Sequence, residues 1–131
     1  MPRILFVCIE NAGRSQMAEA FAIKWAAPGV EIFSAGSRPT SAPHPAAIEA
    51  MREVGLDISQ KKPKGFGELP QGVFDVVVGM GCGDACPISR AKRVVSWEIA
   101  NPKDQPMDLV RRIRDEIEEK VKTLLNPGGG A

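Results

Sequence analysis

Residues 3–25 read RILFVCIENAGRSQMAEAFAIKW, which is an apolar run, a short polar loop and a helical pattern in succession. The run Arg3–Val7 predicts a buried strand, and Ser15–Trp25 predicts a helix. Cys8 therefore stands where a strand ends, and Arg14 stands where a helix begins. The N–H groups of such a loop, together with the positive end of the helix dipole, form a site for an anion.

Cys8 is predicted to be a nucleophile in this anion site. The positive field of the loop favours its thiolate, which is the reactive form, and Ser15 can donate a hydrogen bond to the sulfur. Arg14 carries a planar fork that can hold two oxygens of a tetrahedral anion. Together these groups indicate attack of sulfur on phosphate or a similar oxyanion. The residues expected to surround that anion are Ile9, Glu10, Asn11, Ala12, Gly13 and Arg14.

Composition indicates an ordinary globular chain. It has 131 residues, 44% of them hydrophobic and 25% charged, which predicts a single domain over residues 1–126 and a flexible tail over 127–131. A net charge of +1 gives no support for a nucleic-acid or membrane partner. We expect no signal peptide and a cytoplasmic location, where three cysteines favour redox or catalytic use over structural disulfides.

Strand and helix patterns alternate along the chain, which predicts an α/β fold with a parallel sheet and helices on both faces. The last helix carries apolar residues three or four apart and so has one buried face; they are Met107, Val110, Ile113, Ile117, Val121 and Leu124. Residues 61–72 are expected to be a loop. The expected elements before that helix are strands at 3–7, 30–34, 74–79 and 93–96 and helices at 15–25 and 45–54.

The segment CIENAGRSQMAEAF resembles the phosphate loop of the low-molecular-weight protein tyrosine phosphatase superfamily, and most of all its arsenate reductase branch. The resemblance extends over nearly the whole chain. It implies a four-stranded sheet in the order 2-1-3-4. It continues through the segments 34–36, 45–51, 56–59, 80–87 and 110–117.

Two further cysteines, Cys82 and Cys86, follow the third predicted strand. In a parallel sheet this is the same edge as the one that carries Cys8. Gly81 and Gly83 flank Cys82 and favour a mobile loop on which the two thiols could form a disulfide. Two packed thiols, or a zinc site completed by His44, are alternative interpretations.

The resemblance assigns these thiols an order of action. Cys8 would attack arsenate, with phosphate and sulfate as substrate analogues, and form a covalent arsenic adduct. Cys82 would then attack Cys8 and release arsenite, and Cys86 would attack Cys82. A thioredoxin or a low-molecular-weight thiol would reduce the resulting Cys82–Cys86 disulfide. The close spacing of Cys82 and Cys86 departs from the pattern with a longer insertion and does not identify the final reductant.

Asn101-Pro102 is a second departure from the phosphatase pattern. Phosphatases of this superfamily carry an aspartate before that proline as the general acid, and an asparagine cannot donate a proton at any useful pH. We therefore expect weak hydrolysis of phosphate monoesters. Asp104 or Glu98 could substitute as the acid, although Asp104 is more simply interpreted as a solvated loop charge.

The resemblance also bears on cofactors and metals. Glu19 and Ser34 match positions that help to bind potassium in some reductases, but an acidic ligand is replaced by Lys64. Because the ammonium of Lys64 could take the place of the cation, we predict no metal and no cofactor. Asn11 is expected to hold the loop through its side chain.

Three functions remain in competition at this point. Arsenate reduction through Cys8, Cys82 and Cys86 is the leading one. A phosphatase that works through a phosphocysteine is the second, and Asn101 argues against it. A redox sensor or oxyanion-binding protein without turnover is the third.

Overall fold

The computed structural model describes residues 2–81 and 90–126. All seven predicted strands and helices are present, with ends that differ from the predicted ones by a few residues. In chain order the elements are β1 (Arg3–Cys8), α1 (Arg14–Trp25), β2 (Glu31–Gly36), α2 (Pro45–Arg52), the 3-10 turn η1 (Phe66–Glu68), β3 (Phe74–Gly79), β4 (Ala91–Ser96) and α3 (Met107–Leu125).

The four strands form one parallel sheet in the order β2-β1-β3-β4, which confirms the predicted topology. In this register Cys8 lies opposite Gly36, and Val7 lies opposite Gly79. The carboxyl ends of β1, β2 and β3 therefore meet at one edge. Ligand sites in parallel α/β sheets form at this edge.

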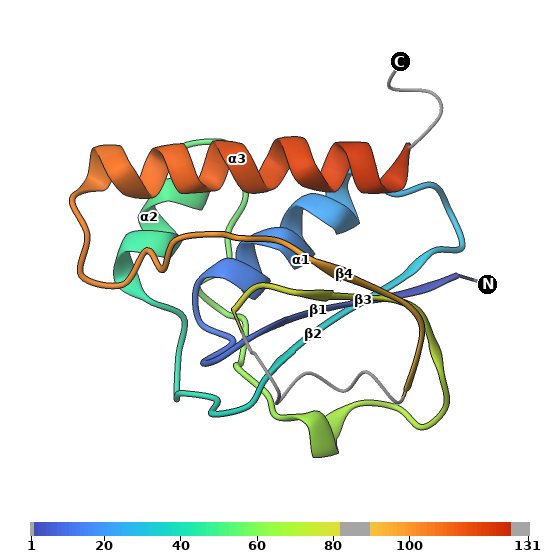
Figure 1. The fold of residues 1–131 in the computed structure, drawn as a ribbon. Helices are drawn as coiled ribbons and strands as arrows, with labels where there is room; N and C mark the ends of the chain where they lie inside the picture. The colour runs from blue at the N-terminus through green and yellow to red at the C-terminus, as the bar shows by residue number, and fades with distance from the viewer. Residues whose placement is uncertain (1, 82–89, 127–131) are drawn as a thin grey trace.

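The side chains of β1 alternate between the two faces of the sheet. Ile4, Phe6 and Cys8 join the core beneath the α-helices, whereas Leu5 and Val7 join a smaller cluster on the opposite face. We predicted helices on both faces. In the described part of the chain, all three α-helices share one face and the helical cover of the other is the short turn η1 (Figure 1).

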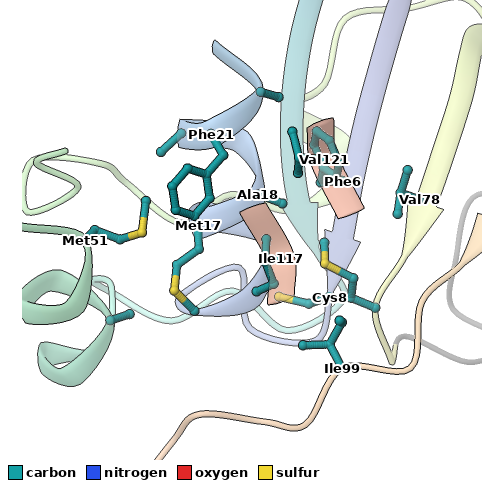
Figure 2. Close-up of a cluster of buried hydrophobic side chains, with 14 of the residues drawn as sticks. Phe6, Cys8, Met17, Ala18, Phe21, Met51, Val78, Ile99, Ile117 and Val121 are labelled. Atoms are coloured by element: carbon teal, nitrogen blue, oxygen red, sulfur yellow. The ribbon is translucent and has the colours of Figure 1, made fainter. Parts of the chain in front are cut away.

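The larger core fixes α1 against the sheet. Every residue of α1 from Arg14 to Ala22 is buried, because the helix lies between the sheet and α3 (Figure 1). Figure 2 shows Met17 and Phe21 of α1 gathered with Phe6, and it places Cys8 in the same cluster. The nucleophile predicted from the sequence therefore stands on tightly packed elements.

Helix α3 confirms its predicted face, since Val110, Ile113, Ile117 and Val121 are all buried. The segment 61–72 differs from its prediction as a loop because it contains η1. The N–H of Gly65 donates to Glu68 Oε2 at 2.8 Å and closes this turn. No helix among the described residues is long and apolar enough to cross a bilayer.

Candidate active site

The loop from Ile9 to Gly13 joins β1 to α1 and lies directly against the end of β2. A Cβ atom on Gly36 would fall 2.5 Å from the carbonyl oxygen of Ile9 and 2.8 Å from the nitrogen of Asn11. No side chain fits into that space, because contacts this short require backbone to move. Glycine at this position lets β2 support the loop at close range.

Backbone hydrogen bonds fix which way this loop faces. Its carbonyls accept from the segment that leads to α2, at 2.7 Å from Arg38 N to Ile9 O, 3.2 Å from Thr40 N to Glu10 O and 2.8 Å from His44 N to Ala12 O. Within residues 2–81 and 90–126, the N–H groups of residues 9–13 have no hydrogen-bond acceptor. Consecutive free N–H groups of this kind are a site for an anion.

The side chain of Asn11 holds the loop in place through hydrogen bonds, as predicted. It adopts a left-handed backbone with φ of 53°, which asparagine tolerates better than most residues. Its side-chain oxygen accepts from Gln16 Nε2 at 3.1 Å and from the N–H of Lys64 at 2.9 Å. Its side-chain nitrogen donates to Ser15 Oγ at 2.7 Å.

This last contact orients the hydroxyl of Ser15 toward Cys8. Ser15 Oγ lies 2.9 Å from Cys8 Sγ. Because the oxygen already accepts from Asn11, the hydroxyl proton is free to donate to sulfur. A donor at this place stabilises the thiolate, which is the nucleophilic form of cysteine.

Arg14 reaches across from the first turn of α1 to the segment after β4. Only 8% of the residue is exposed, and Nη1 donates to the carbonyl of Ile99 at 3.0 Å. Gly81 makes room for it, because a Cβ there would stand 2.7 Å from Arg14 Nη1. The remaining N–H groups of the guanidinium are left to bind an anion.

These groups enclose a cavity of about 180 Å³. Asn11, Ala12 and Ser15 lie buried in the loop and at the start of α1 and support the cavity without lining it. The lining consists of Cys8, Ile9, Glu10, Gly13, Arg14, His44, Asn101 and Lys103. Cys82 and Cys86, the two predicted relay thiols, lie outside the described residues.

His44 and Lys103 line the cavity, although neither was predicted from the sequence to take part in binding the anion. His44 Nε2 lies 3.0 Å from Glu10 Oε1, although the two atoms are not aligned for a hydrogen bond. Lys103 Nζ lies 3.5 Å from Glu10 Oε2. The backbone N–H of His44 donates to Ala12 O at 2.8 Å, and this bond brings His44 onto the loop that follows β1.

Asn101 and the two carboxylates considered as its substitutes lie in different places relative to the cavity. Asn101 lines the cavity, where its side-chain oxygen accepts from the N–H of Lys103 at 3.1 Å. Asp104 has φ of 60° and lines a neighbouring hollow that does not include Cys8. Glu98 is exposed and is also absent from the cavity lining.

Glu19 and Ser34 are buried under the loop with oxygens that lack hydrogen-bond partners among the described residues. The ammonium that approaches Glu19 belongs to Lys61, whose Nζ lies 3.8 Å from Oε1. We had expected Lys64 in this role, but the contact of Lys64 with the site is through its backbone N–H. No group of three His, Cys, Asp or Glu side chains converges within the described ranges.

A profile for low molecular weight phosphotyrosine protein phosphatases matches residues 3–127. The chain belongs to this family. Within it, a glutaredoxin arsenate reductase of Synechocystis sp. is 34% identical over 128 residues, which cover 95% of this chain and 97% of the relative.

Solved structures of this family agree with the fold. A structure described as an arsenate reductase in the phosphate binding state superposes with a TM-score of 0.86 at 32% identity and covers 97% of this chain and 98% of its own. The thioredoxin-dependent arsenate reductase of Corynebacterium glutamicum superposes with a TM-score of 0.77 at 36% identity, over 97% of this chain and 61% of its own.

Proposed function

We propose that this protein is an enzyme that reduces arsenate to arsenite. One observation carries the proposal: Cys8 Sγ, held 2.9 Å from Ser15 Oγ, lines a cavity with Arg14 and a loop of free N–H groups. These are a sulfur nucleophile and a set of donors suited to a tetrahedral oxyanion. Relatives named arsenate reductase support arsenate as that oxyanion.

In the first step, the thiolate of Cys8 attacks arsenic. A sulfur–arsenic bond forms, an arsenic–oxygen bond breaks, and the oxygen leaves as water after it gains protons. Arg14 and the N–H groups of the loop hold the remaining oxygens and neutralise their charge.

In the second step, we assign the electrons to a thiol relay. Cys82 attacks the sulfur of Cys8, a disulfide forms, and the electron pair of the sulfur–arsenic bond reduces As(V) to As(III), which leaves as arsenite. Cys86 then attacks Cys82 and releases the thiolate of Cys8. Each exchange proceeds by attack of a thiolate, as in other disulfide chemistry. The order rests on the family resemblance and on the position of both cysteines after β3.

The reductant of this chain is a thiol. One relative carries glutaredoxin in its name, and another is described as thioredoxin-dependent. We propose thioredoxin or a low-molecular-weight thiol, in the cytoplasm, where reducing conditions keep such cysteines reduced. The chain would act as one domain over residues 1–126. Arsenite production measured with thioredoxin, with glutaredoxin plus glutathione, and with mycothiol identifies the reductant.

Phosphatase activity is a second candidate function because the family is named for it. Asn101 in the cavity lining speaks against it as the main activity. We expect slow hydrolysis of aryl phosphates by the same Cys8.

The relay is tested by acid quench and peptide mapping after one turnover. Cys86→Ser should produce one arsenite per molecule and accumulate a Cys8–Cys82 disulfide. Cys82→Ser should stop earlier, as the arsenic adduct on Cys8. Normal turnover of Cys86→Ser with thioredoxin, or a Cys8–Cys86 disulfide in the wild-type protein, would contradict this order.

A further inference from the structure

His44 is the one histidine of the chain, and it lies on the wall of the cavity that contains Cys8. Its ring is packed closely in this position. A Cβ on Gly13 would stand 3.2 Å from His44 Cδ2 and 3.1 Å from Pro102 Cγ. The edge of the imidazole that carries Cδ2 and Nε2 therefore faces the loop.

The first step of the proposed reaction requires a proton donor at this place. An oxygen that leaves arsenic as water must gain protons as its bond breaks, and a positioned acid accelerates such a step by about 10²- to 10⁴-fold. Asn101 carries no ionisable proton. Asp104 lines a different hollow, and Glu98 is not among the lining residues.

We propose that His44 is the general acid of this site and takes the role that Asn101 cannot fill. The inference rests on the proposed function for its substrate. The protonated imidazole gives the proton on Nε2 to the leaving oxygen while the thiolate of Cys8 bonds to arsenic. Water departs, neutral His44 remains, and the ring regains its proton from solvent. Cys8 and His44 line the same cavity of about 180 Å³, so an anion bound at Cys8 shares this small space with the ring.

The charges around His44 suit this role. Glu10 Oε1 lies 3.0 Å from Nε2. Lys103 Nζ is 3.5 Å from the other oxygen of Glu10. Arg14 and Cys8 line the same cavity as the ring, and Asp104 lines the neighbouring hollow with it.

The experiment uses aryl phosphates, because they report on the same cavity and their leaving groups can be varied. His44→Gln should lower kcat by about 10²- to 10³-fold for phenyl phosphate and by less than about threefold for 2,4-dinitrophenyl phosphate, because a good leaving group needs no acid. Inhibition by inorganic phosphate should stay the same. The kcat/KM of the wild-type protein should fall at alkaline pH, and this fall should be absent from His44→Gln.

A carboxylate introduced at position 101 should restore the activity that His44→Gln loses. Asn101→Asp should raise phenyl phosphate hydrolysis only slightly in the wild-type background but restore most of the lost rate in His44→Gln. Asp104→Asn is the matched control, since asparagine tolerates the left-handed backbone at that position, and it should retain the wild-type rate and pH profile.

Equal losses for good and poor leaving groups in His44→Gln would overturn the proposal. So would an Asp104→Asn variant that reproduces the His44→Gln pattern, or a rate gain from Asn101→Asp that is the same in both backgrounds. Arsenite assays on the same variants test arsenate reduction separately from the role of His44 as the acid. Absence of arsenite from the wild-type protein with every thiol reductant refutes arsenate reduction, whereas the leaving-group pattern alone decides the role of His44.

Discussion

The floor and the rim of the cavity are built in opposite ways. The floor is buried and tied into the fold: 3% of Cys8 and 8% of Arg14 are exposed, and Asn11 and Ser15 are fully covered. The rim is more open, with 47% of the Lys103 side chain exposed. We define the floor as Cys8, Asn11, Arg14 and Ser15 and the rim as Glu10, His44, Asn101 and Lys103.

This difference separates the groups that bind the anion from the groups that lie near its leaving oxygen. Groups on the floor have their geometry set by hydrogen bonds from several elements, as preorganised stabilisation of an oxyanion requires. Groups on the rim are partly exposed, and one of them, His44, is the acid that we propose for the leaving oxygen. The phosphatase pattern is retained on the floor and lost on the rim at Asn101, so one scaffold can bind the same anion shape and treat its leaving group differently.

Removal of the nucleophile from the floor should have the largest effect. Cys8→Ser should lower both arsenite production and aryl phosphate hydrolysis by about 10³-fold or more, because an alcohol is a far weaker nucleophile at neutral pH. Binding of inorganic phosphate, measured by calorimetry, should persist, since the N–H groups and Arg14 remain. Substantial arsenite from this variant would remove Cys8 from the mechanism.

Displacement of a floor group without its removal should have an intermediate effect. Gly81→Ala puts a Cβ 2.7 Å from Arg14 Nη1 at a φ of +99°. The new atom forces the guanidinium to shift, and because Nη1 also donates to the carbonyl of Ile99, the shift disturbs that hydrogen bond. We expect kcat/KM to fall by about 10- to 100-fold.

Gly55→Ala is the control for Gly81→Ala, because it has a similar φ of +83° but open space around the new atom. It should lose about 1–2 kcal/mol of stability from backbone strain and keep its kcat/KM. Equal kinetic losses in the two variants would show that strain, and not the position of Arg14, is the cause.

Removal of an ion pair beneath the floor should have a smaller effect, on the free energy of unfolding. Lys61→Met removes the ammonium 3.8 Å from the buried carboxylate of Glu19. Because Lys61 is partly exposed, the loss in unfolding free energy should be about 1 kcal/mol. Lys62→Met, at an exposed neighbour, should change little. If the ammonium stands in for a cation, potassium chloride should raise the Tm of Lys61→Met more than choline chloride does, and equal responses would contradict that role.

A charge cluster remote from both floor and rim should have the smallest effect. Hydrogen bonds from the guanidinium of Arg111, and then of Arg114, hold the pKa of Glu53 below its ordinary value of 4.5. A lowered pKa stabilises the folded state above the unfolded pKa and ceases to do so as acid protonates the group. Glu53→Gln should therefore lower the Tm slightly at pH 7, with a difference that shrinks below about pH 4.5, and should leave kcat/KM unchanged.

Local sequence patterns determined most of the fold and the floor. The apolar run of β1, the loop that follows it and the buried face of α3 are set by interactions between near neighbours in the chain. The same holds for the pairing of Cys8 with Ser15, because both flank one loop. Such features can be predicted because the relevant spacing is written in the sequence.

The tertiary structure alone decided which distant groups meet this loop. His44 reaches the cavity through a backbone bond to Ala12, and the carbonyl of Ile99 holds Arg14 from 85 residues away. Lys61, not Lys64, approaches Glu19. Asp104, close to Asn101 in sequence, turns into a separate hollow. These contacts depend on strand register, turn conformation and side-chain reach, and residue type and spacing along the chain do not contain that information.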